Sequence, residues 1–556
     1  MNYPWLVLGV LGTAALAGGL ARVTRQYGIA AISGSSVILL LHSIFYFHYT
    51  SDDAYISYRY ARNLSDGMGL VWNPGQHVEG YSNFLWVWIL AGLSFVGDDI
   101  VLSGRWLGFV LAIVAAGGAY LLTTKLIEGE AGRVAGLVVT LLLASSGAWA
   151  LWASAGLESP LFATLVLSAV ILHLREREHV LMPASGVVWA LVSMTRPDGV
   201  LLFAVSGVFK IGEGALRVRR SKSTMLPVLR EAASMVMWLG GFAIIFGPYF
   251  AWRYETYGWF FPNTYYAKVG TGFDQWDRGV RYLASFLQES GGWLLLLAPL
   301  AIAMTAIRRA AVLYVFALLL AWMAYVTYIG GDSLLRFRFF AGVMPLFYVV
   351  TVVSIAALVD AVHIETAPRR WVPQVAVVFA CAGAILFTLQ PSAADSDRIS
   401  GERQAVSDRA EIGRWLRGNL PDTTVVAAVP VGAIAYESHL TVIDMLGIND
   451  EDIAHRDIAL GEFPAGHEKY DSEYVLDKQP DIIILFDGLS ASPWTSLDYA
   501  TLNNVFIPAV VDMLGSQRLA REYERRAVEV QEDKWLNVYV RRGAAPVLAK
   551  TEAAPP

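Results

Sequence analysis

The chain has 556 residues, of which 55% are hydrophobic and only 16% are charged. A soluble globular protein carries about 25% charged residues, so this composition indicates a polytopic membrane protein. The mean hydropathy of +0.47 agrees with that class. The net charge of −6 gives no electrostatic footprint of nucleic-acid binding, and the single cysteine, Cys381, excludes an internal disulfide.

Apolar runs of helical length follow one another along the first 390 residues. A membrane-spanning helix needs about 20 such residues, and the runs predict about 11 or 12 spans. The candidate spans are 4–20, 28–49, 100–124, 134–153, 160–174, 181–194, 198–212, 232–251, 291–307, 310–330, 339–360 and 371–390. We therefore expect residues 1–390 to form a membrane domain built of α-helices.

Basic residues in the connecting segments predict the orientation of these helices. Lys and Arg gather in cytoplasmic loops, and the densest group lies in the segment 210–230. All basic loops fall on one side if the segment 82–97 is an interfacial or re-entrant helix that does not cross the membrane. The motifs SDDAYISYRYARNL, SAGLESP, TRPDG and GGD then share the extracytoplasmic side with the loop 252–290. We expect a multi-pass plasma-membrane protein whose outer loop, about 50–99, carries the chemistry.

The motif SDDAYISYRYARNL (51–64) places Asp52 beside Asp53 directly after an apolar span. One interpretation is structural: Ser51 or Asp52 caps a surface helix, and Asp53 stabilises the helix dipole. The other interpretation is catalytic, because a carboxylate beside a like charge and an apolar slab has a raised pKa and suits a general base. The residues alone do not decide between the two.

The helix expected after the acids has one polar, aromatic face. Asp52, Tyr55, Arg59 and Arg62 share this face because their spacing follows the helical period. The face is either embedded among lipid headgroups or forms a basic, aromatic wall beside the acids. In the second case, these residues contact substrate.

Polar residues also stand at the ends of apolar segments. Glu79 and Asn83 lie at the start of the segment 82–97, where they either bind sugar hydroxyls or cap a helix. Arg196 and Asp198 of TRPDG stand between two uncharged helices, where charged groups are costly and functional by default; alternatively, they neutralise each other. Both flanking helices are expected to be short, about 21 Å against about 30 Å of hydrocarbon, which puts TRPDG in a recess.

Two further outer segments supply groups suited to a phosphate. Lys268 can pair a phosphate as a point charge, and Arg336 or Arg338 can hold one bidentately. Asn263 and Asp332 are the neighbouring groups expected to contact substrate. The alternative for both segments is an aromatic belt with headgroup anchors.

The composition changes after residue 390, and the pattern predicts an α/β domain over 391–545 on the outer side. The loop GHEK (466–469) lacks the further ligands that a metal site needs, and we interpret it as structural or acceptor-contacting. The last residues, 546–556, are expected to be disordered. The predicted elements are an amphipathic helix at 403–420, strands at 423–429, 440–446, 481–486 and 535–542, and helical stretches near 499–515.

The run SDDAYISYRYARNL…GLVWNPGQHVEGYSNFLW after an apolar helix resembles the GT-C superfamily of integral membrane glycosyltransferases, which use polyprenyl-phosphate sugars as donors. TRPDG and GGDSLLRFRFF also look like that group. The resemblance covers the membrane region, is most specific in the DD loop, and is closest to bacterial arabinofuranosyltransferase-like members that complete cell-wall arabinan. The tail domain is similar to outer domains of some of these enzymes. The sequence has no WWDYG-like motif, which argues against an oligosaccharyltransferase.

The resemblance implies an inverting glycosyltransferase. Asp52, with Asp53 beside it, would take a proton from an acceptor hydroxyl, whose oxygen would attack the anomeric carbon. Polyprenyl phosphate would leave toward the cationic residues named above. No redox cofactor is needed, whereas a divalent metal at Asp52 and Asp53 stays undecided. The donor sugar is arabinofuranose, mannose or another sugar, and the acceptor is a cell-envelope glycan, a lipid or a protein.

Two other classes of protein fit parts of the sequence. A transporter places ionisable groups near the membrane midplane, whereas these spans are nearly free of charge, with Arg105 near an outer end as the clear exception. A non-catalytic protein that binds lipid-linked glycans would tolerate Asp52→Asn. The enzyme hypothesis instead predicts that this substitution abolishes transfer.

Overall fold

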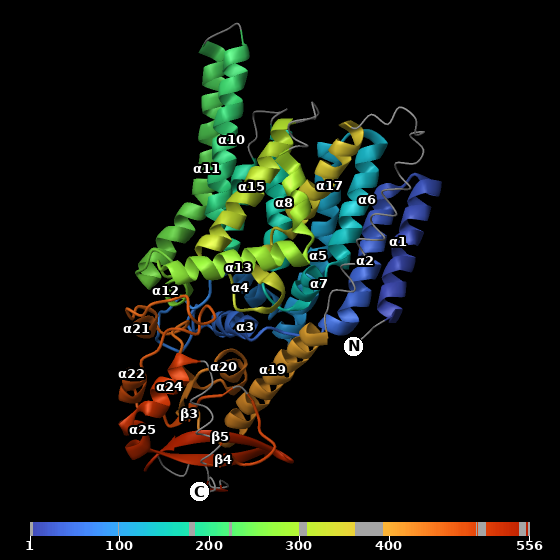
Figure 1. The fold of residues 1–556 in the computed structure, drawn as a ribbon. Coiled ribbons are helices and arrows are strands. Elements are labelled where there is room, and N and C mark those ends of the chain that lie inside the picture. Colours follow the sequence, from blue (N-terminus) through green and yellow to red (C-terminus); the bar gives the residue numbers. More distant parts are fainter. Residues whose placement is uncertain are drawn as a thin grey trace.

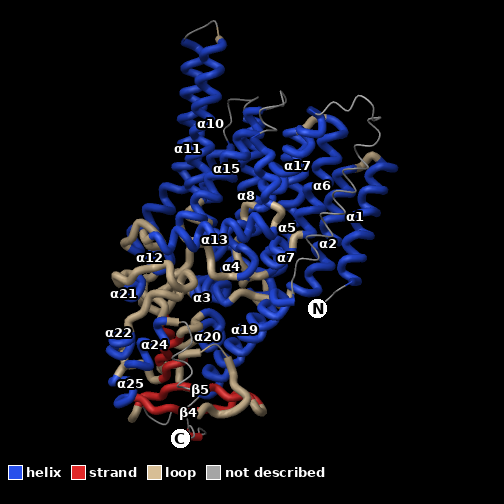
Figure 2. The backbone as a smooth tube through the Cα atoms, viewed as in Figure 1, coloured by secondary structure: helices blue, strands red, loops and turns tan. Residues whose placement is uncertain are grey.

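The computed structural model describes residues 4–97, 99–176, 184–221, 225–299, 309–361, 393–486, 488–495, 498, 507–543 and 552–553. These residues form a bundle of long helices with a smaller domain at one end (Figure 1). We call the smaller domain, from α19 (Ala393–Asn419) onward, the tail domain. The sheet of the protein lies in this domain, whereas the bundle is helical (Figure 2).

Six helices in the described part of the chain are long and apolar enough to cross a membrane, and two bent helix pairs raise the number to eight. The prediction of a polytopic helical membrane protein is therefore confirmed. The bent pairs are α6 (Gly129–Ser145) with α7 (Gly147–Ser154), at 68°, and Leu335–Ala341 with α17 (Met344–Ala361), at 76°. The six long helices are α2 (Tyr27–Tyr46), α5 (Ile100–Leu126), α8 (Ser159–Glu176), α10 (Gly199–Arg220), α11 (Met225–Tyr257) and α15 (Arg309–Tyr328).

Further helices complete the bundle. The segment predicted not to cross forms α4, which is ten residues or about 15 Å long and packs against α3. The predicted span 291–307 begins as the 3₁₀-helix η1 (Gly292–Leu297); its residues 300–307 and the whole predicted span 371–390 lie outside the described residues. The further elements are α1 (Pro4–Thr24), α3 (Asp52–Ser65), α4 (Phe84–Leu93), α9 (Ala184–Thr195), α12 (Asn263–Lys268), α13 (Phe273–Glu289), η2 (Leu335–Phe337) and α16 (Arg338–Ala341).

The helices on the two sides of TRPDG differ in length. Helix α9 has 12 residues, about 18 Å, and is short as predicted. Helix α10 has 22 residues, so the prediction of a short helix is wrong on that side. The helix continues to Arg220 because Leu, Arg and Ala of its last turns favour helical backbone. Its end forms, with the start of α11, the tip of a hairpin far from the tail domain (Figure 1).

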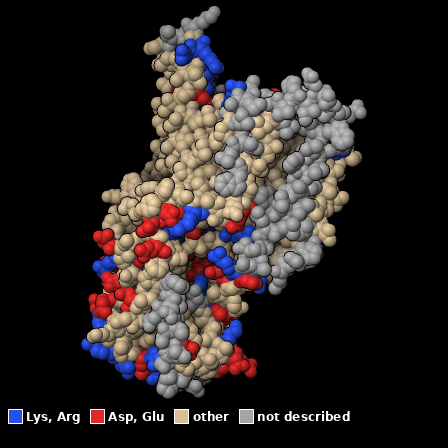
Figure 3. Space-filling model, viewed as in Figure 1, with Lys and Arg blue, Asp and Glu red and all other residues tan. Residues whose placement is uncertain are grey.

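Charged side chains divide the visible surface into zones (Figure 3). Lys and Arg gather at the tip of the α10–α11 hairpin, and residues of both signs cover the tail domain and the adjoining end of the bundle. Between these zones, the described surface is nearly free of charge on this face, as a lipid-facing band requires. The protein is therefore a multi-pass membrane protein with the tail domain at one membrane face.

The tail domain is built on one mixed sheet with the strand order β2-β1-β3-β5-β4-β6. The first three strands are parallel and strongly apolar, and β5, β4 and β6 add antiparallel neighbours. The four predicted strands are confirmed, whereas β4 escaped prediction because its run YERRAVEVQ is rich in charge. The strands are β1 (Val425–Ala428), β2 (Thr441–Asp444), β3 (Ile482–Ile484), β4 (Tyr523–Gln531), β5 (Lys534–Arg541) and β6 (Glu552–Ala553).

Helices surround this sheet. Helix α19 confirms the predicted amphipathic helix, and the helix expected near 499–515 is described from residue 508 onward. Of the tail expected to be disordered, Glu552 and Ala553 pair with β4 as β6, and the other residues lie outside the described ones. The further helices are α20 (Gly432–Ser438), α21 (Glu451–Ala454), α22 (Ser472–Asp477), α24 (Pro508–Gly515) and α25 (Gln517–Glu522).

Candidate active site

Helix α3 carries both acids in its first turn and lies between the bundle and the tail domain (Figure 1). Ser51 precedes the helix with extended backbone, but its side chain makes no capping hydrogen bond. The negative charges of Asp52 and Asp53 nevertheless favour this end of the helix dipole. Successive residues of a helix point about 100° apart, so the two carboxylates meet different surroundings.

A cavity of about 290 Å³ lies where α3, TRPDG, α12 and the GGD segment meet. This volume is near the lower end of the roughly 300–1,000 Å³ of ligand sites. The outer motifs predicted to lie on one side of the membrane thus converge on one cavity. Among the described residues, its charged lining consists of Asp53, Glu158, Arg196, Asp198, Lys268, Asp332 and Arg338, and Asn83 lines it as well.

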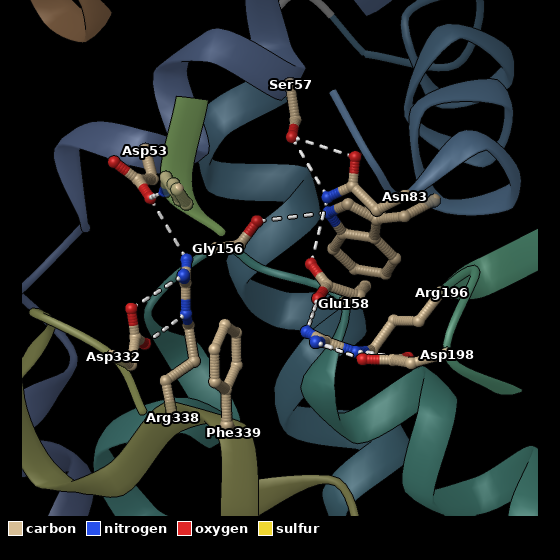
Figure 4. A network of polar contacts seen from close by, with 12 residues as sticks. Asp53, Ser57, Asn83, Gly156, Glu158, Arg196, Asp198, Asp332, Arg338 and Phe339 are labelled. Atoms are coloured by element: carbon tan, nitrogen blue, oxygen red, sulfur yellow. Dashed lines mark hydrogen bonds and ion pairs between the residues drawn. The ribbon is translucent and has the colours of Figure 1, made fainter. Parts of the chain in front are cut away.

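Arg338 joins Asp53 to Asp332 (Figure 4). Its Nη1 donates to Asp53 Oδ2 at 3.0 Å, and its Nε and Nη2 donate to the two oxygens of Asp332 at 2.7 and 3.0 Å. Lys268 Nζ lies 3.6 Å from the same Asp53 oxygen. Asp53 therefore has two cations at ion-pair distance, one of which is shared with a second carboxylate.

The backbone turns sharply just before Arg338. Arg336 and Phe337 have φ values of 53° and 54°, a left-handed conformation that costs a residue other than glycine about 1–3 kcal/mol. The indole N–H of the buried Trp152 donates to the carbonyls of Leu335 and Arg336 and holds this turn. The turn allows Arg338 to reach the cavity, whereas Arg336 is not among the lining residues.

A second arginine, Arg196, joins the other two acids of the lining (Figure 4). Its Nε and Nη2 donate to Asp198 at 3.1 and 2.8 Å, and its Nη1 donates to Glu158 at 2.8 Å. Asn83 donates to the other Glu158 oxygen at 2.9 Å. The Phe339 ring lies near both guanidinium groups, 4.9 Å from that of Arg196 and 5.1 Å from that of Arg338. Both arginines are thus held by two carboxylates and an aromatic face.

The surroundings of Asp53 determine its ionisation. Burial acts to raise the pKa of Asp53, but the charges of Lys268 and Arg338 outweigh burial and lower the pKa to about 2. The charge of His467, in the GHEK loop, acts in the same direction. The prediction of a raised pKa is wrong for Asp53, because these cations come from segments far along the chain. Asp53 is ionised at neutral pH.

Asp52 is directed to the tail domain and does not line the cavity. Its carboxylate accepts hydrogen bonds from the backbone N–H groups of Gly432 and Ala433, and Arg409 Nη1 lies 3.5 Å away. The other residues of the predicted helical face follow it. Tyr55 packs against Tyr436, and Arg59 and Arg62 donate to backbone carbonyls of the tail domain. This face, which we call the Asp52 face, is a domain interface.

Two other candidate residues also lie outside the lining. Glu79 is buried and forms a bidentate ion pair with Arg253 near the end of α11. Asn263 donates to the carbonyls of Gly447 and Ile448 in the tail domain, at 2.8 and 3.0 Å. Both residues fix the loops around the cavity, so they act on its shape and do not meet its contents.

The described residues around Asp52 and Asp53 do not fit a resident divalent metal ion. Among the described residues, no group of three or more His, Cys, Asp or Glu side chains is placed to hold one. Asp53 already faces two cations, and Asp52 points to backbone N–H groups. A divalent ion needs several oxygen ligands free of such partners.

The sequence did not single out Glu158 or Ser57. Glu158 stands in SAGLESP as a lone acid just before the apolar helix α8, and that position was the available signal. Ser57 lies one helical turn after Asp53 and exchanges hydrogen bonds with Asn83 at 3.0 and 3.2 Å. The aromatic residues of the lining are Tyr81, Phe261, Tyr265, Tyr325, Tyr328 and Phe339.

Two solved structures share this architecture. ArnT from Cupriavidus metallidurans, solved bound to undecaprenyl phosphate, aligns with a TM-score of 0.57 at 11% sequence identity, over 95% of this chain and 99% of that chain. This chain has the GT-C fold. The archaeal oligosaccharyltransferase AglB from Archaeoglobus fulgidus, in complex with an inhibitory peptide and a dolichol-phosphate, aligns with a TM-score of 0.50 at 12% identity, over 95% and 75% of the two chains. The predicted resemblance is confirmed at the level of the fold.

Sequence comparisons add two findings. The terminal β-(1→2)-arabinofuranosyltransferase of Mycobacterium tuberculosis is 26% identical over 280 residues, which are 47% of this chain and 41% of the relative. The chain thus matches less than half of that relative's length. Residues 397–539 match a family described as a domain of unknown function, DUF8728. The arabinofuranosyltransferase is therefore a partial relative of this chain, and the family match falls within the tail domain.

Proposed function

We propose that this protein is an inverting glycosyltransferase that moves a sugar from a polyprenyl-phosphate donor to a hydroxyl group of an acceptor. The observation that carries the proposal is the ionised Asp53, which lines a cavity beside Lys268, 3.6 Å away, where the helical bundle of a GT-C fold meets the tail domain. A carboxylate base and a phosphate-binding cation are the two groups that this reaction needs. The proposal places the cavity and the tail domain on the extracytoplasmic side, with a membrane domain over 1–390 and a tail domain over 391–545.

In the proposed reaction, Asp53 and not Asp52 is the general base. The acceptor O–H bond breaks and its proton goes to the Asp53 carboxylate. The oxygen forms a bond to the anomeric carbon from the side opposite the phosphate, which inverts that carbon. The bond from the anomeric carbon to the phosphate oxygen breaks at the same time, and polyprenyl phosphate leaves with the electron pair. Support comes from position, because Asp53 lines the cavity and Asp52 does not.

Lys268 is the proposed partner of the donor phosphate. Arg196 and Arg338 are each bound bidentately by one carboxylate and contact a second one, so their donors are largely occupied. Lys268 is held more loosely, with its ammonium group 3.6 Å from Asp53. Its point charge can turn to an arriving phosphate without breaking a bidentate pair.

Donor binding then activates the base. A phosphate that pairs with Lys268 competes for the charge that lowers the pKa of Asp53. The pKa of Asp53 therefore rises when the donor is bound, and the carboxylate becomes a stronger base when the leaving group is in place. Deprotonation of the acceptor is coupled in this way to the presence of the donor.

The proposed substrates follow from the relatives. The curated relative is named as an arabinofuranosyltransferase, and ArnT was solved with undecaprenyl phosphate. We take arabinofuranose on a polyprenyl phosphate as the first donor to test and a cell-envelope glycan as the acceptor. The aromatic side chains of the lining offer faces on which sugar rings can pack.

The test is a donor panel. Purified protein is incubated with polyprenyl-phosphate arabinofuranose, mannose and other sugars, together with an oligosaccharide acceptor, and mass spectrometry follows donor and product. We expect one donor to be consumed by the native protein and not by Asp53→Asn. Equal consumption by both proteins, or none with any donor, contradicts the proposal.

A further inference from the structure

Helix α20 of the tail domain lies along α3 and is held at its N-terminal end by Asp52. The two carboxylate oxygens accept from the N–H groups of Gly432 at 3.1 Å and Ala433 at 3.0 Å. These N–H groups belong to the first turn of α20, where they have no partner within the helix. The seven residues of α20 include no side-chain cap of their own at this end. Asp52 therefore serves as the missing cap from another domain.

The C-terminal end of α20 is held by arginines of the same α3 face. Arg59, which is buried, donates to the carbonyls of Ala435 and Leu440. Arg62 donates to the carbonyl of Tyr436, and its guanidinium group lies 4.6 Å from the centre of the Tyr436 ring. The last carbonyls of a helix carry partial negative charge, so cations are favourable there. Helix α3 thus clamps both ends of α20, with the sign of charge that each end favours.

The loop after α3 extends this interface to the edge of the sheet. Strand β2 is an edge strand, and its Val442 exposes an N–H group and a carbonyl on that side. Asn73 accepts from the Val442 N–H at 3.0 Å and donates to its carbonyl at 2.9 Å, while Trp72 donates to the same carbonyl at 2.8 Å. Arg59 in turn donates to Asn73 at 2.8 Å. The contacts of α3 with α20 and those of Trp72 and Asn73 with β2 therefore form one connected network, which Arg59 joins.

This network leads to the catalytic cavity. At the end of β2, Asp444 accepts from the backbone N–H and side-chain amide of Asn449 at 2.8 and 2.9 Å. The preceding residue, Ile448, lines the cavity, as does Ala465 of the same domain. Asn263 at the start of α12 holds the Ile448 carbonyl from the bundle side. The tail domain therefore supplies part of the cavity wall and is fixed there from two directions.

We infer that the tail domain, which matches a domain of unknown function, is a wall of the catalytic cavity that α3 clamps in place; this inference rests on the proposed function. Asp52, Arg59 and Arg62 are positioning residues that act through α20 and β2. Because Asp52 and Asp53 are adjacent, the clamp fixes the first turn of α3 and with it the direction of the Asp53 carboxylate. If these contacts are lost, the tail domain moves away from the cavity, and the Asp53 carboxylate is misplaced at the same time.

Gly432→Ala tests the clamp without touching the cavity. A Cβ atom at Gly432 would collide with the backbone oxygen and the carboxylate of Asp52, so the substitution separates α20 from α3. Gly418→Ala in the same domain is the matched control, because a Cβ atom there meets open space. Asp52→Leu is a second variant, which removes the cap and leaves α20 unchanged.

Two measurements are made on the full chain. Hydrogen–deuterium exchange reports the backbone of 432–438 and of the wall segment 447–450, without any donor. Steady-state transfer then gives kcat and donor KM. We expect Gly432→Ala and Asp52→Leu to raise exchange in both segments at least tenfold and to lower kcat at least tenfold. Donor KM should stay within threefold, because Lys268 is untouched, and Gly418→Ala should behave as the native protein.

The outcomes separate the inference from the proposed function. Unchanged exchange in both clamp variants overturns the clamp, and raised exchange at 432–438 alone overturns the link to the wall. Raised exchange in both segments with an unchanged kcat overturns the positioning role. If the native protein transfers no sugar, the proposed function fails. In that case, exchange of the wall segment still supports or overturns the role of the tail domain as a clamped wall.

Discussion

Helix α3 has two faces that differ in what covers them. The Asp52 face is closed by the tail domain: its carboxylate and guanidinium groups meet N–H groups and carbonyls of α20. The next face, with Asp53, Ile56 and Ser57, lines a cavity. Neighbours in the sequence point about 100° apart on a helix, so one pair of acids serves two purposes. The difference teaches that adjacency in a motif does not imply a shared role.

The largest expected effect separates the two acids directly. Asp53→Asn removes the proposed base while it keeps the size of the side chain, and we expect transfer to fall about 10²- to 10⁴-fold. Asp52→Asn keeps one oxygen that can accept from α20, so we expect its rate to stay within tenfold of the native rate. Single-turnover transfer with saturating donor measures both. A larger loss in Asp52→Asn than in Asp53→Asn reverses the assignment.

The Asp52 face should contribute more to the stability of the fold than the face that lines the cavity. Arg59→Met leaves buried carbonyls of the tail domain without their donor, which costs about 1–3 kcal/mol. We expect a lower midpoint of thermal unfolding in detergent, with the loss seen in the tail domain. Arg281→Met is the control, because its ion pair with Asp277 is exposed and worth about 0–1 kcal/mol. Equal shifts in both variants would mean that the Asp52 face is not a tight interface.

The face of α3 that lines the cavity should determine how transfer depends on pH. Lys268 and Arg338 lower the pKa of Asp53, so Lys268→Met raises that pKa. The ionised base is lost as the pH falls through its pKa, and the acidic limb of kcat/KM therefore moves to higher pH in the variant. We also expect donor KM to rise about tenfold, or about 1.4 kcal/mol, from loss of the phosphate partner. Lys534→Met, in the tail domain, should leave the pH profile unchanged, and an unmoved acidic limb in Lys268→Met contradicts the pairing with Asp53.

The smallest expected effect comes from the same face one turn further on. Ser57→Ala removes the hydrogen bonds that orient Asn83, which keeps its contact with Glu158. The loss of one such bond costs about 0.5–1.5 kcal/mol, and we expect acceptor KM to rise about threefold. Ser65→Ala is the control, since that hydroxyl bonds only a carbonyl of its own helix among the described residues. A tenfold fall in kcat for Ser57→Ala would instead give this face a direct part in the chemistry.

The sequence predicted what local patterns determine. The apolar runs predicted most of the helices, four strands of the tail domain followed from β-branched runs, and the helical period predicted that Asp52, Tyr55, Arg59 and Arg62 share a face. What covers that face could not be predicted, because α20 lies more than 360 residues further along the chain. The predicted direction of the Asp53 pKa shift was wrong for the same reason, since Lys268 and Arg338 reach Asp53 only in the folded protein.

Backbone detail escaped prediction as well. The left-handed turn at Arg336 and Phe337 decides which arginine of RFRFF reaches the cavity, and neither residue type favours that conformation. The bend between α6 and α7 falls at Ser146, within a run that reads as one continuous span. Both features depend on packing against distant elements, which a local pattern does not contain.

The contacts between α3 and α20 also determine how long α3 lacks its partner while the chain is synthesised. Arg59 and its acceptor Ala435 are 376 residues apart, so at about 5–20 residues per second α3 waits roughly 20–75 s for its partner to be synthesised. During that interval, the edge strand that Asn73 covers does not yet exist, and Asp52 and Arg62 lack their partners in the tail domain. A chain that terminates before residue 432 therefore lacks the helix that covers the Asp52 face.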